Sequence, residues 1–267
     1  MRILLISDVE EKVLWDHWKQ AGAQRLEGIQ LILSAGDLKP EYLEFLVTMT
    51  SVPLLYVRGN HDSVYDAKPP EGCMHIDDRL VYAIEDRGTG HVTVAEDARA
   101  ARKIADNLLR ETDCKRSGNT PKDNARTEEA DITGVAKAGE KTIRLYRIAG
   151  LGGSLRYRKG SDMFTDREMA ARVHKLRRKL RRSRSYVMGS EADLDILLTH
   201  APCLGHGDLS DLPHRGFACF NRLLEDYEVA MHCYGHVHMN YDRLRRETEH
   251  PSGTRLVNCC GMHIVEI

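Results

Sequence analysis

Side chains that could bind a metal ion recur in this sequence directly after short apolar runs. Most are carboxylates and imidazoles, with one amide oxygen and no thiolate, a donor set that suits divalent ions such as manganese, iron, zinc or magnesium. One such residue after an apolar run is usually structural, but their repetition along the chain indicates a shared metal site. The residues of this kind are Asp8, Glu10, Asp37, Asn60, His61, Asp62, His200, His236 and His238.

The apolar runs before these residues predict the strands that position them. In the first 62 residues, runs at 3–6, 29–33 and 54–57 each end in a turn and precede a segment with helical spacing. Repeated strand-turn-helix units indicate an α/β fold with parallel strands. Ligands of such sheets bind at the carboxyl edge of the strands, which is where the polar residues fall.

The second half of the chain repeats this arrangement. We expect strands at 143–149, 194–198, 229–234 and 255–260. His236 and His238 follow the third of these, and their spacing of two in extended chain turns both side chains to the same face. Two imidazoles on one face can serve two neighbouring metal ions.

Residues 92–142 differ in character from their surroundings. Apolar residues from 98 to 109 recur at helical spacing, and residues 110–142 are mostly polar or charged. We therefore predict a single domain over residues 1–267 with a helical and mobile insertion at about 92–142. A lid that binds a partner is the alternative interpretation.

Composition limits the classes of function. The 267 residues are 42% hydrophobic, with a formal net charge of −1 and a pI of about 6.9, as in a globular protein without an overall field for nucleic acid or membranes. No apolar stretch is long enough for a transmembrane helix or a secretory signal. Seven scattered cysteines without a CxxC pattern indicate reduced thiols in a cytoplasmic protein and disfavour a thiolate zinc site.

Other residues suggest contacts with substrate. Arg156 follows a glycine-rich turn at 150–153, and its guanidinium could clamp a phosphate, although such a turn is more often only a turn. His206 and His214 lie in the segment after His200 and could touch substrate or belong to an ordinary loop. A helix at 169–182 carries many arginines and lysines, which is usually a solvated face and alternatively a nucleic-acid footprint.

The ordered motifs resemble the signature blocks of the calcineurin-like metallophosphoesterase superfamily. The blocks are Asp8 with the residue two later, Gly36-Asp37, Gly59-Asn60-His61-Asp62, His200 and Gly235-His236-Val237-His238. This resemblance spans nearly the whole chain. It implies a four-layer αββα sandwich of two mixed β-sheets flanked by helices, with two metal ions at the sheet ends.

The resemblance also implies roles for individual residues. Asp37 would bridge the two metals and His61 would be the catalytic histidine near the leaving group, with Asp62 orienting its imidazole. A hydroxide held between metals about 3.5–4 Å apart would attack phosphorus, and His61 would protonate the departing oxygen. The first metal would be held by Asp8 and His238, and the second by Asn60, His200 and His236.

Glu10 departs from the family pattern, which is usually Asp-x-His in the first block. A carboxylate in place of an imidazole favours harder ions, so we expect manganese, iron or magnesium over zinc, with manganese or iron favoured. We expect Glu10 to bind a metal; the alternative is that its side chain points away and the first site loses a ligand.

These observations predict a metal-dependent hydrolase of phosphate esters. A phosphodiesterase acting on a nucleotide or another small ester is the first choice. The alternatives are a phosphomonoesterase, a nuclease that uses the basic helix, and a binding scaffold that retains the fold without activity.

Overall fold

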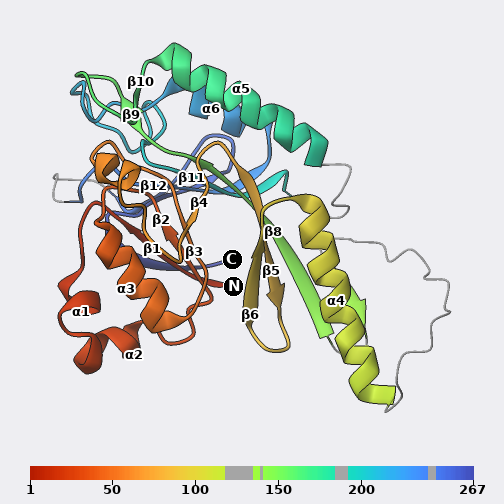
Figure 1. Ribbon diagram of the computed structural model, residues 1–267. Coiled ribbons are helices and arrows are strands. Elements are labelled where there is room, and N and C mark those ends of the chain that lie inside the picture. The colour runs from red at the N-terminus through yellow and green to blue at the C-terminus, as the bar shows by residue number, and fades with distance from the viewer. Residues whose placement is uncertain (118–134, 139–140, 184–191, 240–244) are drawn as a thin grey trace.

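The computed structural model describes residues 1–117, 135–138, 141–183, 192–239 and 245–267, with side chains described outside 111–142. Its strands form two large mixed β-sheets, and helices lie on the outer side of each (Figure 1). The two termini meet near the centre of the molecule, where the amino group of Met1 donates to the carbonyl of Ile267 at 2.7 Å.

The smaller of these sheets has the strand order β15-β1-β2-β3-β4. Strands β1 to β4 are mutually parallel, and β15 pairs with β1 in the antiparallel sense. The carboxyl ends of β1, β2 and β3 therefore lie side by side. The strands are β1 (Arg2–Ser7), β2 (Leu31–Ser34), β3 (Leu54–Tyr56), β4 (Met74–His75) and β15 (Gly261–Glu266).

The larger sheet has the order β13-β14-β12-β11-β8-β5-β6, with β7 also paired to β8. Its centre is parallel, from β8 through β11 and β12 to β14, and its edges are antiparallel. A separate short pair is made by β9 (Ser154–Leu155) and β10 (Met163–Phe164). The strands of the larger sheet are β5 (Leu80–Asp86), β6 (His91–Ala95), β7 (Val135–Ala138), β8 (Lys141–Leu151), β11 (Leu194–Thr199), β12 (Val229–Tyr234), β13 (Glu247–Glu249) and β14 (Arg255–Asn258).

Three apolar clusters separate four layers. The central cluster joins alternate residues of the two sheets, such as Leu5 and Leu33 from one and Ile148 and Leu198 from the other. A second cluster packs the smaller sheet against its helices, and a third packs the larger sheet against α4, α5 and α6. The helices are α1 (Lys12–Trp15), the π-helical turn η1 (Trp18–Gly22), α2 (Ala23–Arg25), α3 (Pro40–Thr50), the 3₁₀ turn η2 (Asp62–Asp66), α4 (Ala98–Ser117), α5 (Asp166–Ser183) and α6 (Ala218–Asp226).

The four-layer αββα sandwich predicted from the sequence is therefore confirmed. Helix α5 begins with the reciprocal capping bonds that its sequence indicates, since Thr165 N–H donates to Glu168 Oε2 at 2.7 Å and Glu168 N–H donates to Thr165 Oγ1 at 3.3 Å. None of the helices in the described part of the chain is both long and apolar enough to span a bilayer.

The range predicted as a helical and mobile insertion at 92–142 contains more sheet than expected. Strand β6 pairs with β5, and β7 pairs with β8, so both ends of the range add to the larger sheet. Most of the polar stretch expected to be mobile, 118–134 and 139–140, lies outside the described residues. Single-domain organisation stays a prediction.

Candidate metal centre

The carboxyl ends of β1, β2 and β12 each lead into a residue with left-handed backbone. The φ angles are 61° for Asp8, 57° for Asp37 and 68° for His236. This region is sparsely populated by residues other than glycine, and such conformations concentrate at functional sites. The turns aim three polar side chains back across the sheet edge.

His200 follows β11 and is fully buried. Its Nδ1 lies 2.7 Å from the carbonyl oxygen of Ala35, and because a carbonyl only accepts, Nδ1 carries the proton and donates. Its Nε2 lies 3.0 Å from Asn60 Oδ1 and 3.4 Å from Asp37 Oδ2. The ring nitrogen, the amide oxygen and the carboxylate oxygen thus converge on one point, where a shared cation would satisfy their lone pairs.

His236 adds a second imidazole to this point. Its Nε2 donates to the carbonyl of Pro213 at 2.7 Å, which leaves Nδ1 with its lone pair available. The rings of His200 and His236 lie 4.8 Å apart between centroids. Asp37, His200 and His236 each offer one ligand atom, all within 4.8 Å of one another, so the donor chemistry and spacing fit a metal ion.

Charge is strongly coupled at this centre. Burial opposes a charge on His200, but the neighbouring Asp37 carboxylate outweighs it and raises the pKa of His200 to about 10. Burial likewise opposes ionisation of Asp37, yet the charged His200 lowers the pKa of Asp37 to about 2. Burial and the charge on His200 together lower the pKa of His236 to about 3. In the protein alone, one proton therefore occupies the place that a metal cation would take.

Asp8 lies beside this cluster, and burial raises the pKa of its carboxyl while His200 opposes the rise. Glu10 is turned elsewhere, with Oε2 at 3.1 Å from Lys39 Nζ. His238 is half-buried two residues after His236. Among the described residues, Glu10 and His238 are not members of the compact group of metal-type ligands. The set expected for the second metal is thus brought together, and the set expected for the first is not.

The turn after β3 places His61 at the protein surface next to Asp37. The backbone N–H of His61 donates to Asp37 Oδ1 at 2.8 Å. Asp62 is buried, and its Oδ2 accepts the backbone N–H groups of Gly59 at 2.7 Å and Asp37 at 3.0 Å. These bonds hold the turn, whereas the sequence predicted that Asp62 would orient the His61 imidazole. Burial, with repulsion from Asp37, raises the pKa of Asp62 to about 6.

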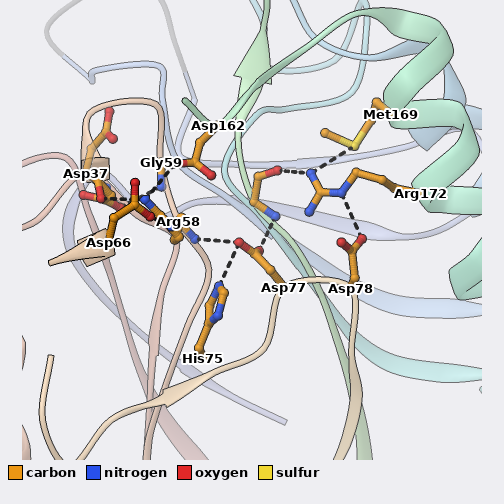
Figure 2. A network of polar contacts seen from close by, with 12 residues as sticks. Asp37, Arg58, Gly59, Asp66, His75, Asp77, Asp78, Asp162, Met169 and Arg172 are labelled. Atoms are coloured by element: carbon orange, nitrogen blue, oxygen red, sulfur yellow. Dashed lines mark hydrogen bonds and ion pairs between the residues drawn. The ribbon is translucent and has the colours of Figure 1, made fainter. Parts of the chain in front are cut away.

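A network of polar contacts holds the turn after β3 (Figure 2). Arg58 binds Asp66 through Nη1 at 2.7 Å and Asp162 through Nη2 at 3.0 Å. Asp77 accepts the backbone N–H groups of Arg58 and Gly152 and lies 2.9 Å from His75 Nε2. The glycine-rich loop therefore uses the amide of Gly152 to bind protein, as expected for a structural turn.

The three residues predicted to touch substrate lie in different places. Arg156 donates to the carbonyl of Met163 and pairs with Glu168 at 2.9 Å, at the start of α5. The ring of His206 lies 4.7 Å from that of His250. His214 is the one placed beside the centre, with its ring 5.4 Å from that of His236.

Tyr157 was missed as a candidate in the sequence, although it directly follows Arg156. Its hydroxyl accepts a hydrogen bond of 3.5 Å from Asn60 Nδ2, which turns Asn60 Oδ1 toward His200. Nothing in its spacing marks it out, because the contact spans 97 residues. A tyrosine close after a glycine-rich strand end was the only available signal.

Several basic side chains of α5 form ion pairs or hydrogen bonds within the protein. Arg172 binds Asp78 at 2.9 Å and the carbonyl of Gly152, and Arg177 pairs with Asp226. These contacts anchor α5 to neighbouring segments. Nucleic-acid binding by the helix stays a prediction.

The chain is similar to known proteins in sequence pattern and in fold. The family model described as calcineurin-like phosphoesterase matches residues 1–240. A solved crystal structure with 11% identity aligns over 99% of this chain and 94% of its own, with a TM-score of 0.52, which supports the fold alone. The structure of TT1561 from Thermus thermophilus aligns over 96% of this chain and 88% of its own at 13% identity and a TM-score of 0.47. No curated protein matches the sequence.

Proposed function

Because the chain belongs to the calcineurin-like phosphoesterase family, whose members hydrolyse phosphoesters with metal ions, we propose that it is a phosphodiesterase acting on a nucleotide or another small ester. The observation that carries the proposal is the convergence of Asp37, His200 and His236, with ligand atoms within 4.8 Å of one another. The exposed His61 beside Asp37 gives this centre a group for proton transfer.

Asp37, His200, His236 and the amide oxygen of Asn60 would hold one divalent metal, with manganese or iron favoured. Bound there, the metal would act as a Lewis acid toward the phosphoryl oxygens and lower the pKa of a water molecule. Asp8 lies near enough to extend the ligand set toward a second metal.

His61 would donate a proton to the departing ester oxygen. Its backbone N–H donates to Asp37 Oδ1, which places residue 61 next to the metal ligands. Imidazole can exchange a proton near neutral pH, which suits a general acid. Asp62 would contribute by holding the turn through the amides of Gly59 and Asp37.

Glu10 remains a proposed ligand of the first metal, although its carboxylate binds Lys39. Exposed ion pairs contribute little stability, so metal binding could compete for this carboxylate. If Glu10 binds the metal, Glu10→Ala will weaken metal affinity and Lys39→Ala will not. Equal affinities in both variants would show that the first site lacks this ligand.

A small substrate is favoured over nucleic acid, since Arg172 and Arg177 of the basic helix are engaged with Asp78 and Asp226. The six described cysteines are free thiols, which supports the proposed cytoplasmic location.

The substrate class is tested by comparing hydrolysis of bis-p-nitrophenyl phosphate with that of p-nitrophenyl phosphate. Metal-stripped protein would be assayed with added manganese, iron, magnesium or zinc. Faster turnover of the diester supports the proposal, and faster turnover of the monoester would make the protein a phosphomonoesterase. Absence of both activities with every metal would favour the binding scaffold.

A further inference from the structure

A cavity of about 630 Å³ lies apart from the metal centre, on the outer side of the larger sheet. It is bordered by β5, the start of α4 and the last turns of α5, which approach one another in Figure 1. None of the metal-centre residues lines it. Its volume is within the usual range for sites that bind small organic ligands.

The cavity has an apolar floor. Leu80 and Tyr82 project from the outer face of β5, and Ala98 begins α4 beside them. Tyr82 is almost fully buried and hydrogen-bonds through its hydroxyl to Ser183, so its ring is held in place. A flat apolar body such as a nucleobase could lie against this floor.

The rim of the cavity is positively charged. Among the described residues, five cationic side chains line it together with the two carboxylates of Glu96 and Asp97. Glu96 Oε2 lies 4.0 Å from Arg79 Nη1 and offsets that charge, whereas Asp97 Oδ1 accepts the N–H of Ala100 at 2.8 Å and caps α4. The cations are Arg79, Arg99, Arg102, Lys179 and Arg182.

Lys179 adds to the positive potential. It donates to the backbone carbonyl of Asp78, a neutral acceptor that leaves the ammonium charge uncompensated at that bond. The cations of the rim come from both α4 and α5, so an anion is attracted from two helices at once.

We propose that this cavity is a binding site for an organic phosphate of nucleotide size, distinct from the metal centre. The apolar body of the ligand lies on Leu80, Ala98 and the aliphatic parts of the rim side chains, and its phosphates lie among Arg99, Arg102 and Lys179. Arginine binds phosphate oxygens through paired N–H groups, which suits this rim.

The test is a calorimetric titration of ATP into the full chain in the presence of EDTA, which suppresses binding through metals. Arg102→Glu reverses a charge of the rim, and Lys103→Glu is its matched control, because Lys103 is exposed on the same helix and does not line the cavity. We expect ATP to bind the wild type and the control alike and to bind Arg102→Glu at least about tenfold more weakly. Inorganic triphosphate, which lacks the apolar body, is expected to bind about tenfold more weakly than ATP.

Four results would overturn the proposal: no binding of ATP, equal weakening in both variants, equal affinity for triphosphate, or loss of binding in Asp37→Asn with Arg102→Glu unaffected. A single-stranded 20-nucleotide DNA that binds more tightly than ATP would assign the surface to nucleic acid instead. Diester hydrolysis by Arg102→Glu is expected to match the wild type, so failure of this site is distinguishable from failure of the proposed activity.

Discussion

The backbone N–H of His236 donates to both carboxylate oxygens of Asp8, at 3.1 and 2.9 Å, across 228 residues of chain. Both residues have left-handed φ angles, so the ends of β1 and β12 are held against each other by two unusual backbone turns. Gly235 makes this approach possible, because a Cβ at its position would lie 2.7 Å from Ser7 Oγ and 2.8 Å from Asp8 Oδ2.

Gly235→Ala is therefore expected to force the two strand ends apart. We expect a loss of about 1–3 kcal/mol in the free energy of unfolding, as for other overpacked sites, and weaker manganese binding. Urea unfolding and calorimetric titration with manganese measure the two effects. In Gly160→Ala, where a Cβ would meet only the side chain of Met163, both quantities should stay near wild type. Equal effects of the two substitutions would contradict this account.

His61→Ala is expected to lower the turnover of bis-p-nitrophenyl phosphate by about 10²–10⁴-fold, the usual contribution of a general acid. Manganese affinity should change little, because the link from residue 61 to Asp37 is made by the backbone N–H. His91→Ala removes another exposed histidine, at the start of β6, and should retain full turnover. Unchanged turnover in the His61 variant would remove this residue from the mechanism.

Tyr157→Phe removes the hydroxyl that accepts the hydrogen bond from Asn60. We expect manganese binding to weaken by about 2- to 10-fold, the range that one hydrogen bond supplies. Tyr227→Phe is the matched control, since the Tyr227 hydroxyl donates to the carbonyl of Arg177 at 3.4 Å, between α5 and α6. If both variants bind manganese like the wild type, Tyr157 does not position Asn60.

His232 should make the protein less stable in mild acid. Its Nε2 lies 2.7 Å from Thr199 Oγ1, whose own proton goes to the carbonyl of Ala201, so the histidine donates there as a neutral ring. Burial lowers the pKa of His232 to about 3 from the ordinary 6.5. Below about pH 6.5 the unfolded chain therefore binds a proton at His232 that the folded chain does not bind. The free energy of unfolding is not reduced by this proton above about pH 6.5, and it decreases as the pH falls toward 3.

The decrease in the free energy of unfolding approaches about 1.4 kcal/mol per pH unit, or about 2 kcal/mol between pH 6.5 and 5. Urea unfolding at a series of pH values measures it. In His232→Gln this part of the pH dependence should disappear, while the exposed His17→Gln should keep it. The same slope in wild type and His232→Gln would contradict the assignment.

Local patterns in the sequence predicted most of the parallel core. The runs at 3–6, 54–57 and 229–234 correspond to β1, β3 and β12, because buried parallel strands are apolar without interruption. The run at 255–260 was expected to be the closing strand, but the chain instead turns at Gly261, with φ of 74°, and adds β15 to the other sheet. The pattern of hydrophobic residues does not reveal that the chain passes from one sheet to the other.

The candidate site was only partly readable from sequence. Asp37, His200 and His236 follow strands and could be identified by type and position. Three other contacts depend on how distant segments pack. They join Glu10 to Lys39, Arg156 to Glu168 and Tyr157 to Asn60. Such tertiary contacts have no local periodicity, so spacing could not predict them.

We propose that Asp37, with His200 and His236, holds the metal on which hydrolysis depends. The most direct test measures manganese affinity and turnover of bis-p-nitrophenyl phosphate in metal-stripped wild type, in Asp37→Asn and in the exposed control Asp16→Asn. We expect manganese binding and manganese-dependent turnover in the wild type and the control, with both lost in Asp37→Asn. Turnover in Asp37→Asn equal to that of the wild type, or turnover that persists without metal, would contradict it.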